Sequence, residues 1–200
     1  MRTLVVGGHS RSIGKTALVV DLIRAFPEAG WTAVKITQYG HGVCSISGAD
    51  CGCAPAEHTV ALDEEQDRSN RTDTSRFLVA GAERALWLRT KQGRLGEAMP
   101  LLRQELRGAW NVIIESNTLL RFLRPELYLV VLDPAQRDFK ESARHFLDRA
   151  DAFVLRAALG EGGWPEVSRR LVEHKPCFVQ PLGQALPAHV ADFVRDRFFS

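Results

Sequence analysis

The chain has 200 residues, a length that suits one domain with a substantial hydrophobic core. Its 26 basic and 24 acidic residues give a net charge of +2, which excludes a strongly basic nucleic-acid-binding protein and an acidic disordered tail. No stretch approaches the ~18 consecutive apolar residues of a membrane span, and the apolar run at the start is too short for a signal peptide. We therefore expect a cytoplasmic protein with reduced cysteines and with no nucleic-acid or membrane partner.

Short apolar segments alternate with helical patterns along most of the chain. The predicted strands are mostly apolar on both faces, as buried parallel strands are: Thr3–Val6, Thr32–Ile36, Ala85–Leu88, Asn111–Glu115, Leu127–Leu132, Ala152–Leu155 and Cys177–Val179. The predicted helices carry apolar residues at helical spacing: Thr16–Phe26, Leu95–Leu106, Phe139–Ala150, Glu166–Glu173 and Ala188–Phe199. This alternation predicts an α/β fold, in which a doubly wound, mostly parallel sheet of about seven strands forms a single domain over residues 1–200.

The first predicted strand runs into a glycine-rich loop that ends in Gly14-Lys15-Thr16 at the start of a helix. In such a phosphate-binding loop, the backbone N–H groups and the helix dipole attract phosphate. Lys15 would neutralise the β- and γ-phosphates, and the Thr16 hydroxyl would bind Mg²⁺. The predicted nucleotide-binding residues of the loop are Gly8, Ser10, Arg11, Ser12, Ile13, Gly14, Lys15 and Thr16.

Polar residues at the ends of other strands are expected to complete this site. Glu115 closes an apolar strand, where a carboxylate can hold Mg²⁺ and orient a water molecule, so Glu115 and Lys15 are the predicted catalytic residues. Lys35 and Asn117 lie close to strand ends at the same edge and are predicted to contact the nucleotide. Asp73 and Arg76 are expected to open a helix, with Asp73 as its cap.

The segment from Thr37 to about Arg71 shows no helix or strand period, so we expect an inserted loop at about residues 38–70 after the second strand. It contains three cysteines and a histidine whose thiolate and imidazole groups are the preferred ligands of zinc: Cys44, Cys51, Cys53 and His58. A long loop with few apolar residues cannot order itself by burial, and a bound metal would supply the missing free energy.

Three alternatives for this loop stay open. The first is an iron–sulfur cluster, which would need a fourth ligand such as His41 or Cys177, although Cys177 is itself expected to be a buried thiol of the core. The second is a pair of redox-active thiols. The third is a disordered loop that binds metal only incidentally.

The spacing Gly8-x5-Gly14-Lys15-Thr16 resembles the phosphate-binding loop of dethiobiotin synthetase and the cobyrinic acid amidases. These belong to the branch of P-loop NTPases that includes the signal-recognition-particle and ParA/MinD-type proteins. Gly30–Ile36 resembles the second strand of that branch, and Val112–Asn117 resembles its strand ending in Glu-Gly. The resemblance implies the P-loop NTPase fold and Mg²⁺-dependent binding of ATP or GTP. The guanine-reading Asn-Lys-x-Asp signature is absent after Ala152–Leu155, so the choice of nucleotide stays open.

The stretch Asp73-Thr74-Ser75-Arg76 with Ala80-Gly81-Ala82 resembles a segment of the molybdopterin-guanine dinucleotide biosynthesis adaptor proteins. This resemblance implies slow hydrolysis and a role in molybdenum cofactor biosynthesis with a protein partner. The alternative is an ATP-dependent ligase of the dethiobiotin synthetase type, acting on a small carboxylate or amine. The phenylalanines near the end of the chain, Phe193, Phe198 and Phe199, are expected to close the core, and a homodimer face is the alternative.

Overall fold

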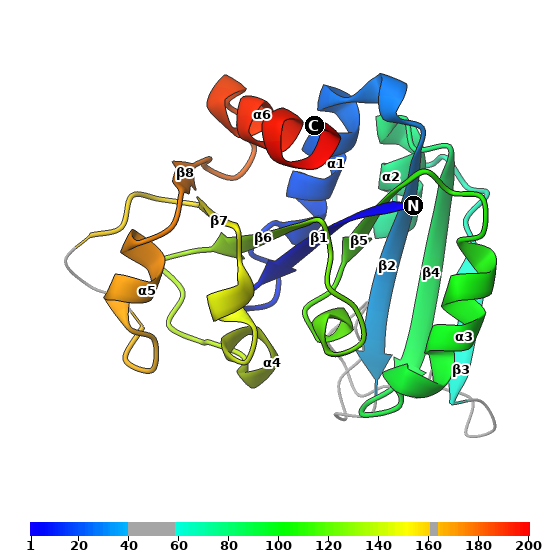
Figure 1. Cartoon of the computed structure of the whole chain (residues 1–200), viewed down its shortest axis with the longest axis horizontal. Coiled ribbons are helices and arrows are strands. Elements are labelled where there is room, and N and C mark those ends of the chain that lie inside the picture. The colour runs from blue at the N-terminus through cyan, green and yellow to red at the C-terminus, as the bar shows by residue number, and fades with distance from the viewer. Residues whose placement is uncertain (40–58, 161–163) are drawn as a thin grey trace.

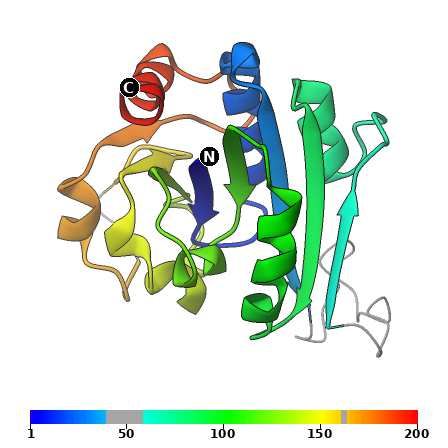
Figure 2. The same cartoon turned by 45° about the vertical axis from the view of Figure 1, so that its right-hand side comes forward.

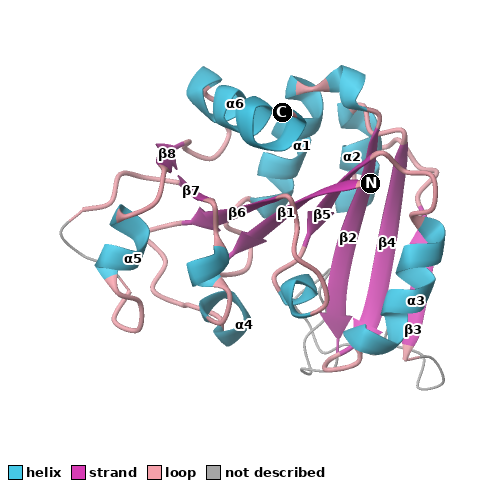
Figure 3. Cartoon of the chain, in the orientation of Figure 1, coloured by secondary structure: helices cyan, strands magenta, loops and turns pink. Residues whose placement is uncertain are grey.

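In the computed structural model, residues 1–39, 59–160 and 164–200 are described, and they form an eight-stranded sheet covered by helices on both faces (Figures 1 and 3). The strands are β1 (Arg2–Gly8), β2 (Trp31–Tyr39), β3 (Val60–Glu64), β4 (Arg84–Lys91), β5 (Asn111–Glu115), β6 (Leu127–Leu132), β7 (Ala152–Leu155) and β8 (Cys177–Val179). Their order across the sheet is β3-β4-β2-β5-β1-β6-β7-β8. Every pairing is parallel except that of β3 with β4. The predicted doubly wound α/β fold is confirmed.

The helices divide into two sets, one on each face of the sheet. They are α1 (Lys15–Ala25), α2 (Asp73–Ala80), α3 (Leu95–Glu105), α4 (Glu141–Arg144), α5 (Arg169–Glu173) and α6 (Ala188–Val194). Apolar residues of α1, α2 and α6 pack on one face, whereas those of α3, α4 and α5 pack on the other. Figure 2 shows α2 and α3 on opposite sides of β4. Buried side chains therefore form two core layers with the central strands between them.

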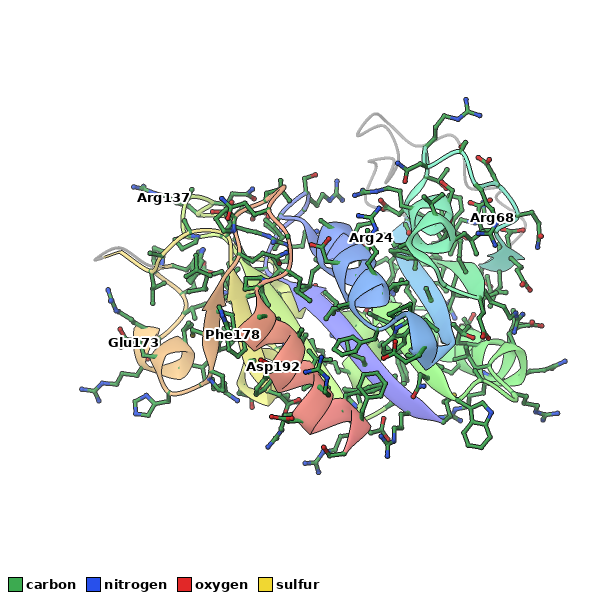
Figure 4. The ribbon with its side chains drawn as sticks, turned by 90° about the horizontal axis from the view of Figure 1, so that it is seen from above. Arg24, Arg68, Arg137, Glu173, Phe178 and Asp192 are labelled. Carbon is green, nitrogen blue, oxygen red and sulfur yellow. The ribbon has the colours of Figure 1, made fainter. Side chains whose placement is uncertain are left out.

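The last turns of the chain close one of these layers. Phe198 stacks on Trp31 with 5.4 Å between ring centroids, and Phe199 lies 5.1 Å from Phe26. Phe178 of β8 lies 5.2 Å from Phe193 of α6, and Figure 4 shows Phe178 on the strand beside that helix. The prediction that the terminal phenylalanines close the core is confirmed. Every helix in the described residues is too short or too polar to span a lipid bilayer.

Strand β3 corrects the prediction that the whole insertion is irregular, because residues 60–64 pair antiparallel with β4. Val60 and Leu62 pack against the core, and the two acidic residues that follow them pair with arginines of β4. Glu64 accepts hydrogen bonds from Arg84 at 2.7 and 3.0 Å, and Asp63 pairs with Arg89. A five-residue strand with two carboxylates gives a weak sequence signal, and its charges protect an exposed sheet edge.

Two predicted helices are shorter than their apolar patterns suggest. Only Glu141–Arg144 is α-helical within the predicted helix Phe139–Ala150, because Phe139 stacks against His9 and Phe146 leaves the helical conformation. Helix α5 begins at Arg169 rather than Glu166. Cys177 is exposed, so its assignment to the core is also wrong.

Candidate nucleotide site

The loop between β1 and α1 is shaped by backbone conformations that favour glycine. Gly14, which precedes the first residue of α1, has φ 87°, and Ser12 has φ 55°. A Cβ atom on Gly8 would lie 2.7 Å from Ile13 and 2.9 Å from the Lys15 stem, so Gly8 leaves room for Lys15 to fold back over the loop. Neither a side-chain cap nor an acidic residue covers the first turn of α1. The amides of that turn are therefore suited to an anion.

Lys15 lies over this loop, where its Nζ donates a hydrogen bond to the Ser10 carbonyl at 2.8 Å. Burial lowers the pKa of Lys15, an effect partly offset by the carboxylate of Glu115 and increased by Lys35. Arg11 and Ser12 are exposed, whereas Ser10 and Ile13 are buried. The Ser10 hydroxyl donates to the Asp138 carboxylate at 3.0 Å. A half-buried ammonium whose hydrogen-bond partner among the described residues is a carbonyl is well placed to meet an anionic ligand.

Thr16, Lys35 and Glu115 come together at the carboxyl edge of the sheet. The Thr16 hydroxyl donates to Glu115 Oε2 at 2.7 Å, and Lys35 Nζ lies 2.5 Å from Glu115 Oε1. The register of β2 and β5 pairs Lys35 with Glu115, which puts both side chains on the α1 face. The structure thus brings together three residues that the sequence predicts for the site.

Asp73 joins this group from the start of α2, with its Oδ2 atom 2.9 Å from Lys35 Nζ. Burial by itself lowers the pKa of Lys35, but the carboxylates of Glu115 and Asp73 outweigh burial, so the pKa is raised. The predicted capping role of Asp73 is wrong, because Thr72 is the cap: its hydroxyl accepts from the Ser75 N–H at 3.0 Å, while Ser75 Oγ accepts from the Thr72 N–H. Asp73 is free to pair with Lys35 as a result.

Asn117 contacts the phosphate loop through the protein backbone. Its Oδ1 accepts a hydrogen bond from the Gly8 N–H at 2.8 Å, and its Nδ2 donates to the Gly8 carbonyl at 2.9 Å. Both ends of the amide are therefore engaged with Gly8. This arrangement positions the loop, and the direct contact of Asn117 with a nucleotide stays a prediction.

His9, at a position where a phosphate loop commonly has glycine, is fully buried and fastens the loop to the segment after β6. Its Nε2 accepts from the Asp133 N–H at 2.9 Å, and its Nδ1 donates to the Asp138 carbonyl at 2.8 Å. The ring stacks on Phe139 at 5.0 Å. Burial lowers the pKa of His9, so the neutral ring with the proton on Nδ1 fits this environment.

Arg156, which follows β7, binds the backbone of the phosphate loop through its guanidinium group. This residue was not predicted from the sequence. It donates to the carbonyls of Ile13 at 2.9 Å and Gly14 at 2.6 Å, and to the Gln180 carbonyl at 3.0 Å. Arg156 stands at the strand end after Leu155, the position at which a guanine-reading signature would begin. The side chain there is used instead to hold the phosphate loop in place.

The hard oxygen donors Thr16 Oγ1 and Glu115 Oε2 fit Mg²⁺, which usually takes one or two protein oxygens and completes its shell with phosphate oxygens and water. Within the described residues, no three His, Cys, Asp or Glu side chains are grouped so as to hold a metal ion by themselves. The predicted zinc ligands Cys44, Cys51, Cys53 and His58, with His41, lie outside the described residues, so the zinc site stays a prediction.

No protein-family model matches the sequence, and no curated protein is significantly similar to it. Among solved structures, HypB from Helicobacter pylori in complex with nickel is similar with a TM-score of 0.50 and 14% sequence identity, covering 96% of this chain and 85% of that one. LpxK from Aquifex aeolicus in complex with ATP has a TM-score of 0.49 and 16% identity, and 53% of its chain is covered, so this chain spans about half its length. At such identities the likeness to HypB is one of fold alone. The chain has the P-loop NTPase fold, and the loop that the sequence predicts to bind phosphate connects β1 to α1.

Proposed function

We propose that this protein binds a nucleoside triphosphate, ATP or GTP, together with Mg²⁺ and hydrolyses it slowly. The observation that carries the proposal is the 2.7 Å hydrogen bond between Thr16 and Glu115 at the foot of the phosphate loop. It joins a hydroxyl at the start of α1 to a carboxylate at the end of β5, the two kinds of oxygen that Mg²⁺ takes from the protein in P-loop NTPases. The ammonium of Lys15 lies over the same loop.

Each residue has a distinct task in this proposal. The loop amides and Lys15 bind the β- and γ-phosphates, and Thr16 and Glu115 hold the metal, directly or through water. Mg²⁺, when bound, neutralises charge that develops on the phosphates. Glu115 orients the attacking water, and Lys35 holds the Glu115 carboxylate in place from β2. Arg156, Asn117 and His9 keep the loop in shape.

Calorimetric titration with Mg–ATP and Mg–GTP tests the proposal directly. Wild type should bind at least one of them, and chelation of Mg²⁺ should weaken binding. Lys15→Ala should abolish binding without unfolding the protein, because the side chain lies at the loop and donates to the Ser10 carbonyl rather than packing in the core. Lys91→Ala removes an exposed lysine at the end of β4 and should bind as wild type does. Equal affinities of wild type and Lys15→Ala would remove the phosphate-loop assignment.

We further propose that the protein is an adaptor of the molybdopterin-guanine dinucleotide type rather than an ATP-dependent ligase. The ion pair between Lys35 and Asp73 supports this, because it joins the second strand to the Asp73–Arg76 stretch on which that resemblance depends. An adaptor should turn over slowly alone and form a complex with a partner protein. Turnover of ATP that is strongly stimulated by a small carboxylate or amine would favour the ligase.

The cysteine-rich part of the insertion is proposed to hold one structural zinc ion near this site. It connects Tyr39 at the end of β2 to Val60 at the start of β3. Lys35 and Asp73 lie at the same edge of the sheet as the end of β2. A metal-bound loop there would lie beside the phosphates, as ligands do at the carboxyl edge of such sheets.

A further inference from the structure

Lys140 is the last residue of the segment that follows β6, and it directly precedes α4. Its backbone N–H donates a hydrogen bond to the carbonyl of His9 at 2.8 Å. The His9 ring in turn bonds to the backbone of Asp133 and Asp138, and the Ser10 hydroxyl donates to the Asp138 carboxylate, so several hydrogen bonds join this segment to the phosphate loop. The position of Lys140 relative to the loop is therefore fixed by the protein itself.

The Lys140 ammonium is half-buried and has neither a hydrogen-bond nor an ion-pair partner in the part of the chain that the structure describes. The charged groups that act on it are Lys15, Arg11 and Asp138, and Lys35 acts on it more weakly. Burial, followed by repulsion from Lys15 and Arg11, lowers the pKa of Lys140 to about 8, and the carboxylate of Asp138 only partly offsets this.

The other charges around the loop are unequally neutralised. Lys35 is paired with both Glu115 and Asp73, and Asp138 accepts a hydrogen bond from Ser10. Lys15 has a carbonyl as its partner, and Lys140 has none in the described residues. Two lysines from different elements thus converge on the loop with little compensation, a costly arrangement unless an anion binds between them.

We propose that Lys140 is a second phosphate-binding lysine, which donates to the phosphate chain of the bound nucleotide from the segment between β6 and α4. This inference rests on the proposed function, and it adds a residue from the β6–α4 segment to the binding site. The ligand class is a nucleotide with at least two phosphates, because one phosphate group is needed to neutralise Lys15 and another to neutralise Lys140. Binding should then couple to protonation of the Lys140 amine.

Calorimetry at pH 8 in two buffers of different ionisation enthalpy measures this coupling, with a non-hydrolysable Mg–ATP or Mg–GTP analogue as the probe. Lys140 is about half protonated at that pH, and a nearby phosphate raises its pKa, so wild type should take up about half a proton on binding. Lys140→Met keeps the apolar stem but removes the amine, and should weaken binding about 10- to 100-fold and abolish the uptake. Lys140→Arg should keep the affinity within roughly threefold and also abolish the uptake, because arginine does not titrate there.

Arg137→Met is the matched control, since Arg137 lies on the same segment but is exposed and points away from the ribbon (Figure 4). It should change neither affinity nor proton uptake. Wild-type affinity in Lys140→Met would overturn the inference and leave the proposed function standing. Proton uptake that persists in Lys140→Arg would come from Lys15 and would also overturn the inference about Lys140. A wild-type protein that binds no nucleotide would overturn both proposals.

Discussion

The backbone N–H of Asp133 points at Nε2 of His9 and donates a 2.9 Å hydrogen bond to it. Because an N–H group faces this nitrogen, protonation of the ring would put two donors against each other. The phosphate loop and the end of β6 are thus joined through a neutral histidine. The loop should be sensitive to pH near the ordinary titration range of that side chain.

The stability of the protein should fall as the pH drops below about 6.5. Burial lowers the pKa of His9 in the folded protein, so the unfolded chain binds more protons between the unfolded and folded pKa values, and acid favours unfolding. Urea denaturation at pH 7.5 and 5.5 measures the effect. His9→Gln should cost about 1–3 kcal/mol at pH 7.5 but lose less stability than wild type on acidification. His145→Gln alters an exposed histidine and should keep the wild-type pH dependence. Parallel pH profiles for wild type and His9→Gln would contradict the assignment of the neutral ring.

Glu115→Gln should reduce hydrolysis much more than binding. The amide keeps the shape of the carboxylate but loses the charge that serves the metal and the attacking water, so turnover should fall roughly 100-fold or more. Nucleotide affinity should change little, since Lys15 and the loop amides remain. Single-turnover hydrolysis together with calorimetry separates the two effects. Glu97→Gln, on the exposed face of α3, is the control. Unchanged turnover in Glu115→Gln would reduce Glu115 to a structural role.

Arg156→Ala should both destabilise the protein and weaken nucleotide binding. The substitution leaves the carbonyls of Ile13 and Gly14 without their buried donor, at a cost of about 2–4 kcal/mol in the free energy of unfolding. Arg156→Lys should recover only part of this, because one ammonium cannot reproduce the planar fork of the guanidinium. Thermal unfolding and calorimetry measure the two effects. Arg103→Ala, at an exposed position of α3, should change neither. Normal binding by a folded Arg156→Ala protein would show that the loop holds its shape unaided.

Purified protein should contain about one zinc ion per chain, bound by Cys44, Cys51, Cys53 and His58. Elemental analysis of protein produced with zinc available tests this. The double variant Cys51→Ser/Cys53→Ser should lose the metal, while Cys177→Ser, which changes an exposed free thiol at the start of β8, should retain it. Less than ~0.1 metal ion per chain would rule out the site, and a brown protein would indicate an iron–sulfur cluster.

Structural features that depend on residues close together in the sequence, such as strands and the phosphate loop, were predictable from the sequence. The bounds of β5, β6, β7 and β8 agree with the predicted apolar runs, because each run ends at a polar or turn residue and those of β5, β6 and β7 are mostly buried, whereas β8 at the sheet edge is exposed at Cys177 and Val179. The phosphate loop was equally clear, since its glycines, Lys15 and Thr16 act over a few consecutive positions. The alternation of strands and helices then predicts the fold class, because parallel strands need a crossover connection, usually a helix.

Only the tertiary structure decided which distant residues meet at the loop. Arg156 and Gly14 are 142 positions apart, and Thr16 and Glu115 are 99 apart, so their contacts depend on strand order and register rather than on local pattern. The same holds for the ion pair of Lys35 with Asp73 and for the approach of Lys140 to His9. The edge strand β3 also escaped prediction, because its pairing partners are arginines of β4. Sequence determines each element through local burial and backbone preference, whereas the charge balance of the site arises only when the sheet brings separate strand ends together.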